Sequence, residues 1–224
     1  MHNMKYELVI FDLDGTILDT LEDLTDSINH ALKQFGYPTR ALEEVRSFVG
    51  DGLLMLTRRA LAPETDEDVV QKVLAEQKAY YKEHCADKTK PYEGIPELLG
   101  ELKATGYKLA VVSNKADYAV QILCEQYFPG IFHMAVGEKE NVRKKPAPDS
   151  VNAVLEELQV ERDHTMYVGD SEVDIKTAEN AGLDAILVSW GFRDADFLRE
   201  QGAKRLVSTV SELKSAFINK TFLL

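Results

Sequence analysis

The sequence predicts an α/β protein in which a doubly wound parallel sheet forms the core and a small all-helical domain is attached to it. Short apolar runs of strand length alternate with segments of helical periodicity through most of the 224 residues, as in parallel sheets that are covered on both faces. One stretch of about seventy residues near the N-terminus shows helical spacing alone. These two patterns predict the two parts of the fold.

Four apolar runs are the expected core strands, because each is followed by polar or glycine residues and then by a helix-like pattern. They cover residues 8–11, 109–112, 165–168 and 185–188, and residues 204–207 are a candidate for a last, short strand. In open parallel sheets, ligands bind beyond the carboxyl ends of the strands. The residues that follow these runs are therefore expected to converge.

The inserted stretch contains apolar residues at helical spacing. A leucine- and isoleucine-rich stripe starts after Thr20 and stops near Gly36, and further helices are expected over residues 53–61 and 66–81. Thr20 and Asp23 have the spacing of a capping pair at the start of the first helix, and Gly36 stands where that helix would end.

This block of helices predicts a lid domain. We expect it to cover residues 18–88 and to be inserted into an α/β core made of residues 1–17 and 89–224. The insertion follows the first strand by only a few residues, so its helices are expected to lie over the strand ends and to exclude water when they close. A closed lid favours small substrates over proteins and nucleic acids.

The charge balance and the cysteines exclude several classes of protein. The chain has 26 Lys and Arg against 38 Asp and Glu, a formal net charge of −12, so nucleic acid and anionic membrane are not expected as partners. No apolar run approaches the roughly 20 residues of a membrane helix, and residues 1–4 do not begin a secretory signal. Cys85 and Cys124 are expected to be reduced thiols in a cytoplasmic protein. The histidines form no HxxH pair, which argues against zinc.

Two aspartates, Asp12 and Asp14, follow the first strand directly. Alternate strand residues share a face, and two neighbouring carboxylates repel each other unless a cation lies close to them. A lone aspartate at a strand end is most often a helix cap or a solvated charge, but this pair, followed by the turn-forming Gly15, favours a cation site. A calcium loop would need glycine at its sixth position, where the chain has Ile17.

Polar side chains also lie at the ends of other predicted strands. Ser113 offers a hydroxyl and Asp170 a carboxylate, with Asp174 one helical turn further along. Lys145 lies in a loop next to prolines and could neutralise a phosphate or a pair of carboxylates. Each of these residues alone has an ordinary reading as a turn residue, a helix cap or a solvated charge. Together, oxygen ligands without His or Cys suit a hard divalent cation, and we expect Mg²⁺.

In combination, these elements resemble the haloacid dehalogenase-like hydrolase superfamily, whose motifs they match in order over nearly the whole chain. The matching elements are Asp12–Thr16, Ser113 after an apolar strand, Lys145-Pro146 and Gly169–Asp174. The resemblance implies a Rossmann-like core with a helical C1 cap directly after the first motif. Within the superfamily, the chain looks most like the phosphoglycolate phosphatase-type members.

The resemblance also implies catalytic roles. Asp12 would be the nucleophile that forms an aspartyl-phosphate, and Asp14 would protonate the leaving alcohol and then activate water. Ser113 would hydrogen-bond the phosphoryl group. Lys145, which matches the family's Lys-Pro where Lys144 does not, would stabilise the transition state electrostatically.

The metal ligands that the resemblance implies are all aspartates. Asp12 and Asp170 would bind Mg²⁺ directly, and Asp14 would face the metal through its backbone carbonyl. Asp174 would bind through water or would orient the other ligands.

The leaving group of the substrate is not readable from the motifs. Thr16 and Asn114 in the motifs and Arg46 in the lid are the candidates for substrate binding, although an exposed helical Arg is the more common outcome for Arg46. We expect a small phosphorylated metabolite, with 2-phosphoglycolate first. The oligomeric state is left open by the sequence.

Three other functions remain alternatives. A sugar phosphomutase of the same superfamily would move the phosphate to another position instead of giving it to water. A phospho-accepting receiver also uses an aspartate and Mg²⁺, but receivers are far shorter and lack a helical insertion. A binding module is the third alternative, although all the reactive positions are filled. Dehalogenases of this fold lack the second aspartate, so Asp14 favours phosphoryl transfer.

Overall fold

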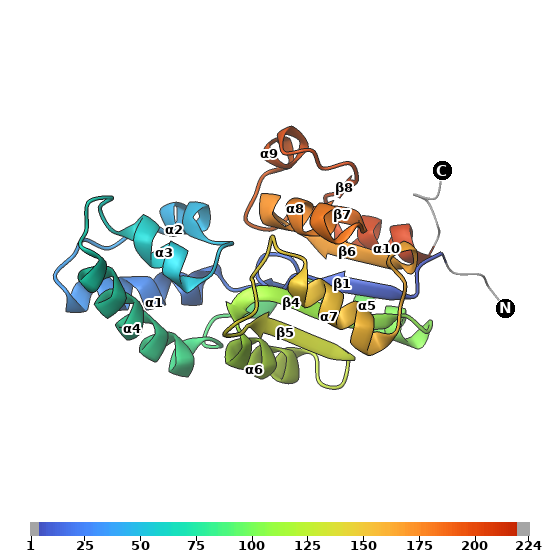
Figure 1. The fold of residues 1–224 in the computed structure, drawn as a ribbon, viewed down its shortest axis with the longest axis horizontal. Coiled ribbons are helices and arrows are strands. Elements are labelled where there is room, and N and C mark those ends of the chain that lie inside the picture. The colour runs from blue at the N-terminus through green and yellow to red at the C-terminus, as the bar shows by residue number, and fades with distance from the viewer. Residues whose placement is uncertain (1–4, 219–224) are drawn as a thin grey trace. The chain divides into compact units, whose positions relative to one another are not determined.

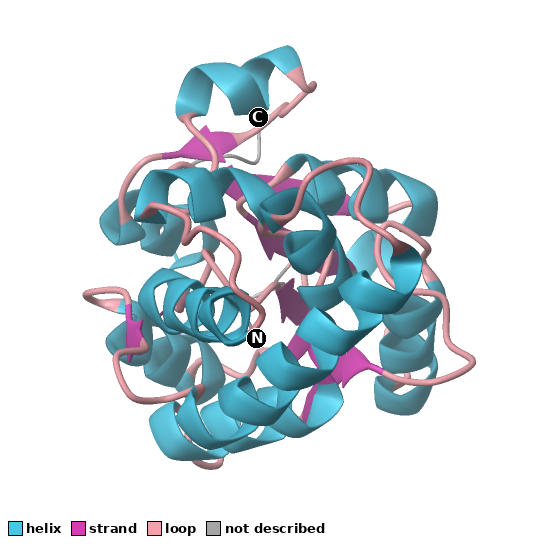
Figure 2. Cartoon of the chain, turned by 90° about the vertical axis from the view of Figure 1, so that its left-hand side faces the viewer, coloured by secondary structure: helices cyan, strands magenta, loops and turns pink. Residues whose placement is uncertain are grey.

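The computed structural model describes residues 5–218, which divide into two compact units. Of the described residues, one unit combines 5–18 with 91–218, and the other is Asp19–Lys90. Far more of the described residues lie in helices than in strands (Figure 2). None of the helices in the described part combines the length and the apolar composition of a membrane span. The expectation that no secretory signal is present falls on residues 1–4, which lie outside the described residues.

The first unit is built on a six-stranded parallel sheet with the strand order β5-β4-β1-β6-β7-β8 (Figure 1). The strands are β1 (Leu8–Phe11), β4 (Lys108–Ala116), β5 (Met134–Glu138), β6 (Thr165–Gly169), β7 (Asp184–Val188) and β8 (Leu206–Val207). The chain continues from β1 to β4 on one side and from β6 to β7 on the other. The switch point of the sheet therefore lies between β1 and β6, which is where ligands bind in such sheets.

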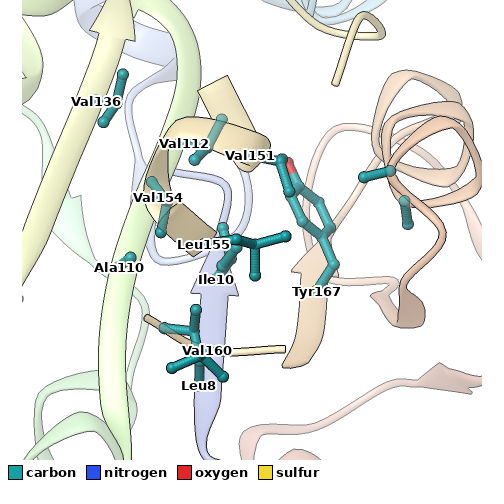
Figure 3. Packing of buried hydrophobic residues seen from close by; sticks show 12 residues of the cluster. Leu8, Ile10, Ala110, Val112, Val136, Val151, Val154, Leu155, Val160 and Tyr167 are labelled. Atoms are coloured by element: carbon teal, nitrogen blue, oxygen red, sulfur yellow. The ribbon is translucent and has the colours of Figure 1, made fainter. Parts of the chain in front are cut away.

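One face of this sheet packs against α7 (Asp149–Leu158) and α8 (Glu172–Ala181) (Figure 3). Alternate residues of the central strands point to this face because successive side chains in a strand point to opposite sides. The strand residues of this cluster are Leu8, Ile10, Ala110, Val112, Val136 and Tyr167, and the helix residues are Val151, Val154, Leu155, Ala178 and Ala181. This packing fixes the ends of the central strands, from which the polar loops emerge.

The other helices of this unit follow from the same winding. The connections from β1 through β4 to β5 run in the opposite direction to those from β5 through β6 to β7, so right-handed crossovers place their helices on opposite faces. The remaining helices are α5 (Ile95–Ala104), α6 (Asp117–Tyr127), α9 (Ala195–Glu200), α10 (Val210–Ile218) and a 3-10 turn at Arg162–His164. α10 packs on α5, and Tyr107 meets Phe217 edge-on beside them.

The structure confirms the predicted fold class, and each of the five predicted runs contains a strand. The sequence does not predict β5, because only its first three residues are apolar and Gly137 and Glu138 resemble a turn. β4 is longer than predicted, since its polar end continues to pair with β5 as far as Ala116. β8 is shorter than predicted and includes only Leu206 and Val207.

The second unit is helical between two short strands that pair with each other, β2 (Leu18–Asp19) and β3 (Lys90–Pro91). Its helices are α1 (Leu21–Gln34), α2 (Leu42–Phe48), α3 (Leu53–Ala60) and α4 (Glu67–His84). α2 is not predicted, because seven residues are too few to show a helical period. The observed unit boundaries, after Leu18 and after Lys90, lie one and two residues beyond the predicted ones.

The predicted capping pair at the start of α1 is wrong in its contacts. Thr20 occupies the cap position, but its side chain makes no capping hydrogen bond, and its hydroxyl oxygen is buried with no partner in the described chain. Asp23 accepts hydrogen bonds from Lys88 N (3.0 Å), Thr89 N (2.8 Å) and Thr89 Oγ1 (2.7 Å). The buried carboxylate therefore connects α1 to the chain that follows α4.

Replacing Asp23 with alanine is expected to destabilise the helical unit by about 2–4 kcal/mol, because three donors at a buried position would lose a charged acceptor. Denaturant unfolding followed by circular dichroism measures this loss. Asp26→Ala is the matched control on the same helix, because Asp26 forms an exposed ion pair with Lys88, and such pairs contribute little. Equal losses in both variants would contradict the role given to Asp23.

Candidate active site

The chain turns sharply after β1, which places Asp12 at the switch point of the sheet. Gly15 has a positive φ of 81°, and its N–H donates to the carbonyl of Leu18 at 2.9 Å. A Cβ atom at position 15 would lie 2.3 Å from Oδ2 of Asp170. Only glycine lets this turn approach the end of β6 so closely.

Asp170 follows β6 and is almost completely buried. Its carboxylate accepts hydrogen bonds from the N–H of Phe192 (2.7 Å) and the hydroxyl of Thr16 (3.1 Å). The segment after β7 also presses against it, since a Cβ atom at Gly191 would lie 2.4 Å from Asp170 Oδ2. The indole N–H of Trp190 donates to the carbonyl of Thr16 at 3.1 Å. Loops from three strands thus fix the orientation of the Asp170 carboxylate.

Lys145 lies at the centre of a buried polar network. Its Nζ atom is 2.9 Å from Oδ1 of Asp12 and 2.8 Å from Oδ1 of Asp174, and it donates to the hydroxyl of Tyr167 at 3.1 Å. Only 3% of the Lys145 side chain is exposed, whereas Lys144 is half-buried. Of the two neighbouring lysines, Lys145 is therefore the one that the structure directs to Asp12.

Asp174 organises the end of β6. Its Oδ1 accepts from Lys145 and from the hydroxyl of Tyr167 (3.0 Å), and its Oδ2 accepts from Asp170 N (3.2 Å), Ser171 N (3.1 Å) and Ser171 Oγ (2.7 Å). The Ser171 and Asp174 contacts form a capping box at the start of α8. With both oxygens engaged, this arrangement suits orientation of the neighbouring groups better than direct metal binding.

The carboxylates of this network have shifted pKa values. Burial raises the pKa of Asp12 to about 7, with the Lys145 ammonium opposing the shift and the Asp174 carboxylate adding to it. Burial and repulsion from Asp174 and Asp12 raise the pKa of Asp170 well above its usual range. Burial alone would lower the pKa of Lys145, but the carboxylates of Asp12 and Asp174 outweigh burial and raise it. A cation among these carboxylates would favour their ionised forms.

The same residues fit a divalent cation. One oxygen from each of Asp12, Asp170 and Asp174 lies within 4.8 Å of the others. The Asp14 carboxylate is not in this group and lies against Lys115 instead. When all four carboxylates are ionised, the ammonium groups of Lys145 and Lys115 leave an excess of negative charge. Oxygen-only ligands and negative charge suit Mg²⁺.

The remaining predicted site residues differ in their surroundings. Ser113 lies near the end of β4, beside β1 in the sheet, and its hydroxyl accepts from the N–H of Lys115 at 3.3 Å. Asn114 donates to the carbonyl of Lys145 at 3.1 Å and so connects β4 to the lysine loop. Arg46 belongs to α2 of the helical unit and is not among the residues that the α/β unit brings together.

Four residues of the site were not among its predicted members. Lys115 holds the Asp14 carboxylate at 2.8 and 3.1 Å, and its position could have been found, because it follows the predicted phosphate-binding serine by two residues along a strand. Tyr167 looks like an ordinary core residue in the sequence. Trp190 and Phe192 lie in a loop without a motif, so no sequence signal points to them.

The fold and the acidic strand ends together define a haloacid dehalogenase-like hydrolase. Residues 9–188 match the sequence family of that description, so the chain belongs to this family and the resemblance in its motifs is confirmed.

Comparison with individual proteins narrows the class further. A phosphoglycolate phosphatase of Chromobacterium violaceum is 32% identical over 217 residues, which cover 94% of this chain and 96% of that protein. A crystal structure from Lactobacillus delbrueckii subsp. bulgaricus, provisionally named as a phosphoglycolate phosphatase, superposes with a TM-score of 0.92 at 42% identity and covers 96% of this chain and 99% of that one. The Protein Tyrosine Kinase A of Mycobacterium tuberculosis has a TM-score of 0.79 at 27% identity, with 96% and 99% covered.

Proposed function

We propose that this protein is a Mg²⁺-dependent phosphatase that hydrolyses small phosphate monoesters through an aspartyl-phosphate on Asp12. The state of Asp12 carries the proposal. Its Oδ1 accepts from Leu13 N (2.7 Å) and lies 2.9 Å from Nζ of Lys145, while its Oδ2 accepts no hydrogen bond from the described residues. One oxygen is fixed by donors, and the other is left to attack phosphorus. The names of the relatives support the phosphatase class.

In the first half of the proposed reaction, Oδ2 of Asp12 attacks the phosphorus atom of the ester. The bond from phosphorus to Asp12 forms as the bond to the alcohol oxygen breaks, and Asp14 gives a proton to that oxygen. The Lys145 ammonium offsets the negative charge that gathers beside Asp12, and Ser113 donates its hydroxyl to the transferring group.

In the second half, water attacks the aspartyl-phosphate. Asp14, now ionised, accepts a proton from the water as the new P–O bond forms. The bond between phosphorus and Asp12 breaks, inorganic phosphate leaves, and the Asp12 carboxylate is restored with Lys145 beside it. Asp14 keeps the proton that it took from water. Asp12 and Asp14 therefore end the cycle in the protonation states in which they began.

Asp12 and Asp170 would hold Mg²⁺, with the backbone carbonyl of Asp14 as a further ligand. When bound, the ion supplies positive charge next to the phosphoryl oxygens. Asp174 would orient Lys145 and the loop that carries Asp170, in keeping with its five hydrogen bonds. The hydrogen bond from Thr16 to Asp170 gives Thr16 a supporting place in this site besides its proposed role in substrate binding.

For the substrate, we infer a small phosphorylated metabolite, with 2-phosphoglycolate first. Two relatives carry the name of a phosphatase for that compound. Residues 19–90 would act as the cap that selects the leaving group, with Arg46 binding a substrate anion and Asn114 helping to hold the phosphate. A cytoplasmic location is consistent with Cys85 and Cys124, which are buried thiols that form no disulfide among the described residues.

Phosphate release tests the proposed function. The purified protein is expected to release inorganic phosphate from 2-phosphoglycolate and from p-nitrophenyl phosphate with Mg²⁺, to stop in excess chelator and to recover when Mg²⁺ is restored. Asp12→Asn is expected to lower turnover by roughly a thousandfold or more, because an amide does not attack phosphorus. Transfer of the phosphate to another position of the substrate would instead indicate a phosphomutase, and a lasting phospho-aspartate without turnover would indicate a receiver.

Lys145 and Lys144 form a matched pair for the electrostatic part of the mechanism. Lys145→Ala removes the ammonium next to Asp12 and is expected to lower kcat by roughly a hundredfold. Lys144→Ala is expected to change kcat by less than about threefold, because Lys144 is not among the groups that contact Asp12. Steady-state kinetics with p-nitrophenyl phosphate measures both. Similar, small effects would show that the Lys145 ammonium does not stabilise the transition state.

The cap proposal predicts a selective effect of Arg46→Ala. KM for the anionic 2-phosphoglycolate is expected to rise by about tenfold, while KM for p-nitrophenyl phosphate, whose leaving group has no carboxylate, stays the same. Equal changes for the two substrates would show that Arg46 does not select the leaving group.

A further inference from the structure

A second buried lysine, Lys115, contacts the other aspartate of the first motif. Its Nζ atom lies 2.8 Å from Oδ1 and 3.1 Å from Oδ2 of Asp14, so one ammonium contacts both carboxylate oxygens. The Lys115 side chain is 3% exposed and that of Asp14 is 19% exposed. An ion pair so well shielded from water is held more strongly than the exposed pairs elsewhere on the chain.

Lys115 is the only described residue that donates a hydrogen bond to the Asp14 carboxylate. The other three aspartates of the site are held by several donors from more than one loop. The orientation of the Asp14 carboxylate therefore depends on Lys115 alone, whereas each of the other three carboxylates is oriented by several donors.

The local backbone places Lys115 for this contact. The pairing of β4 with β5 is regular up to Val112 and resumes only at Ala116, so the strand is irregular where Lys115 lies. Such irregularities turn a side chain away from its ordinary direction and are common beside active sites. A Cβ atom at Gly137 of β5 would lie 2.6 Å from the carbonyl oxygen of Lys115. Glycine on the neighbouring strand thus allows the displaced backbone.

We propose that Lys115 is a positioning residue that orients ionised Asp14 during hydrolysis of the aspartyl-phosphate. The proposal rests on the proposed function. Asp14 is ionised after it has protonated the leaving alcohol, and an ammonium attracts a carboxylate far more strongly than a protonated acid. The contact in the structure, with one ammonium against both oxygens of Asp14, is the geometry that would hold the carboxylate in place while it accepts a proton from water. Lys115 supports the second half of the reaction more than the first.

A two-step reaction makes this division measurable. When only the hydrolysis of the intermediate slows, kcat and KM fall together and kcat/KM, which reports the formation of the intermediate, stays constant. Substrates with different leaving groups then approach the same kcat, because they share the intermediate. A loss of general packing, or a role in binding the phosphate of the substrate, would lower kcat/KM as well.

The test uses Lys115→Met, which keeps the length of the side chain and removes its charge. We expect kcat to fall by about tenfold to a hundredfold with kcat/KM within about twofold of the unmodified protein. 2-Phosphoglycolate and p-nitrophenyl phosphate should give the same kcat, and the aspartyl-phosphate should accumulate in quenched samples. Lys139→Met is the matched control, because Lys139 lies directly after β5 and forms an exposed ion pair with Asp117.

Rescue separates the charge from the packing. Lys115→Cys is expected to behave like Lys115→Met, and alkylation with bromoethylamine, which rebuilds an ammonium at nearly the same place, is expected to restore kcat. The unmodified protein treated in the same way controls for reaction at Cys85 and Cys124, which are both buried.

The outcomes distinguish this proposal from the proposed function. An unmodified protein that releases no phosphate with Mg²⁺ overturns the phosphatase assignment and the role of Lys115 with it. An active protein in which Lys115→Met keeps its kcat, or loses kcat/KM in the same proportion as kcat, overturns the role of Lys115 alone. With p-nitrophenyl phosphate, whose leaving group departs without a proton, an Asp14→Asn variant that accumulates no intermediate while Lys115→Met does would also overturn it, because the lysine acts through Asp14.

Discussion

The site depends on one buried contact, the Lys145 ammonium between the carboxylates of Asp12 and Asp174. The parallel register of β1 and β6 places acidic residues side by side at the switch point of the sheet. Burying each charge alone would cost several kcal/mol, and the carboxylates repel one another in addition. The ammonium offsets both effects, and the Tyr167 hydroxyl completes the hydrogen bonding. Without this lysine, burying the acidic strand ends together as carboxylates would cost more free energy.

A second lysine divides the charges of the site between the two proposed chemical roles. Lys145 faces Asp12, the proposed nucleophile, and Lys115 faces Asp14, the proposed acid–base residue. Close backbone approach makes this arrangement compact. A Cβ atom at Gly169 would lie 2.3 Å from the side chain of Asp174, so the end of β6 accommodates that carboxylate only because the residue is glycine. Close packing against the backbone and the ion pairs together fix the positions of these polar groups.

The sequence by itself determined the fold class and the family. Apolar runs of strand length that alternate with segments of helical spacing are sufficient to predict a doubly wound sheet. A strand that is buried on both faces is apolar at every position, so the whole run is visible in the sequence. The end of each run then fixes which residues lie at the common edge, and this is how Asp12 and Asp170 are found without a structure. The strand β5 and the helix α2 were missed, because their few residues carry too little of either pattern.

Only the tertiary structure decided which partner each polar group takes. In the sequence, Asp23 looks like a capping residue of its own helix, but folding directs it to Lys88 and Thr89, far along the chain. Lys115 contacts the site from an irregular part of β4, and Trp190 and Phe192 contact it from the loop after β7. These contacts depend on strand irregularity, on glycine and on packing between distant segments. The periodicity of a sequence predicts which face or edge of an element a residue occupies. It does not predict how a loop turns, and the direction of the loop determines which partner its polar side chains contact.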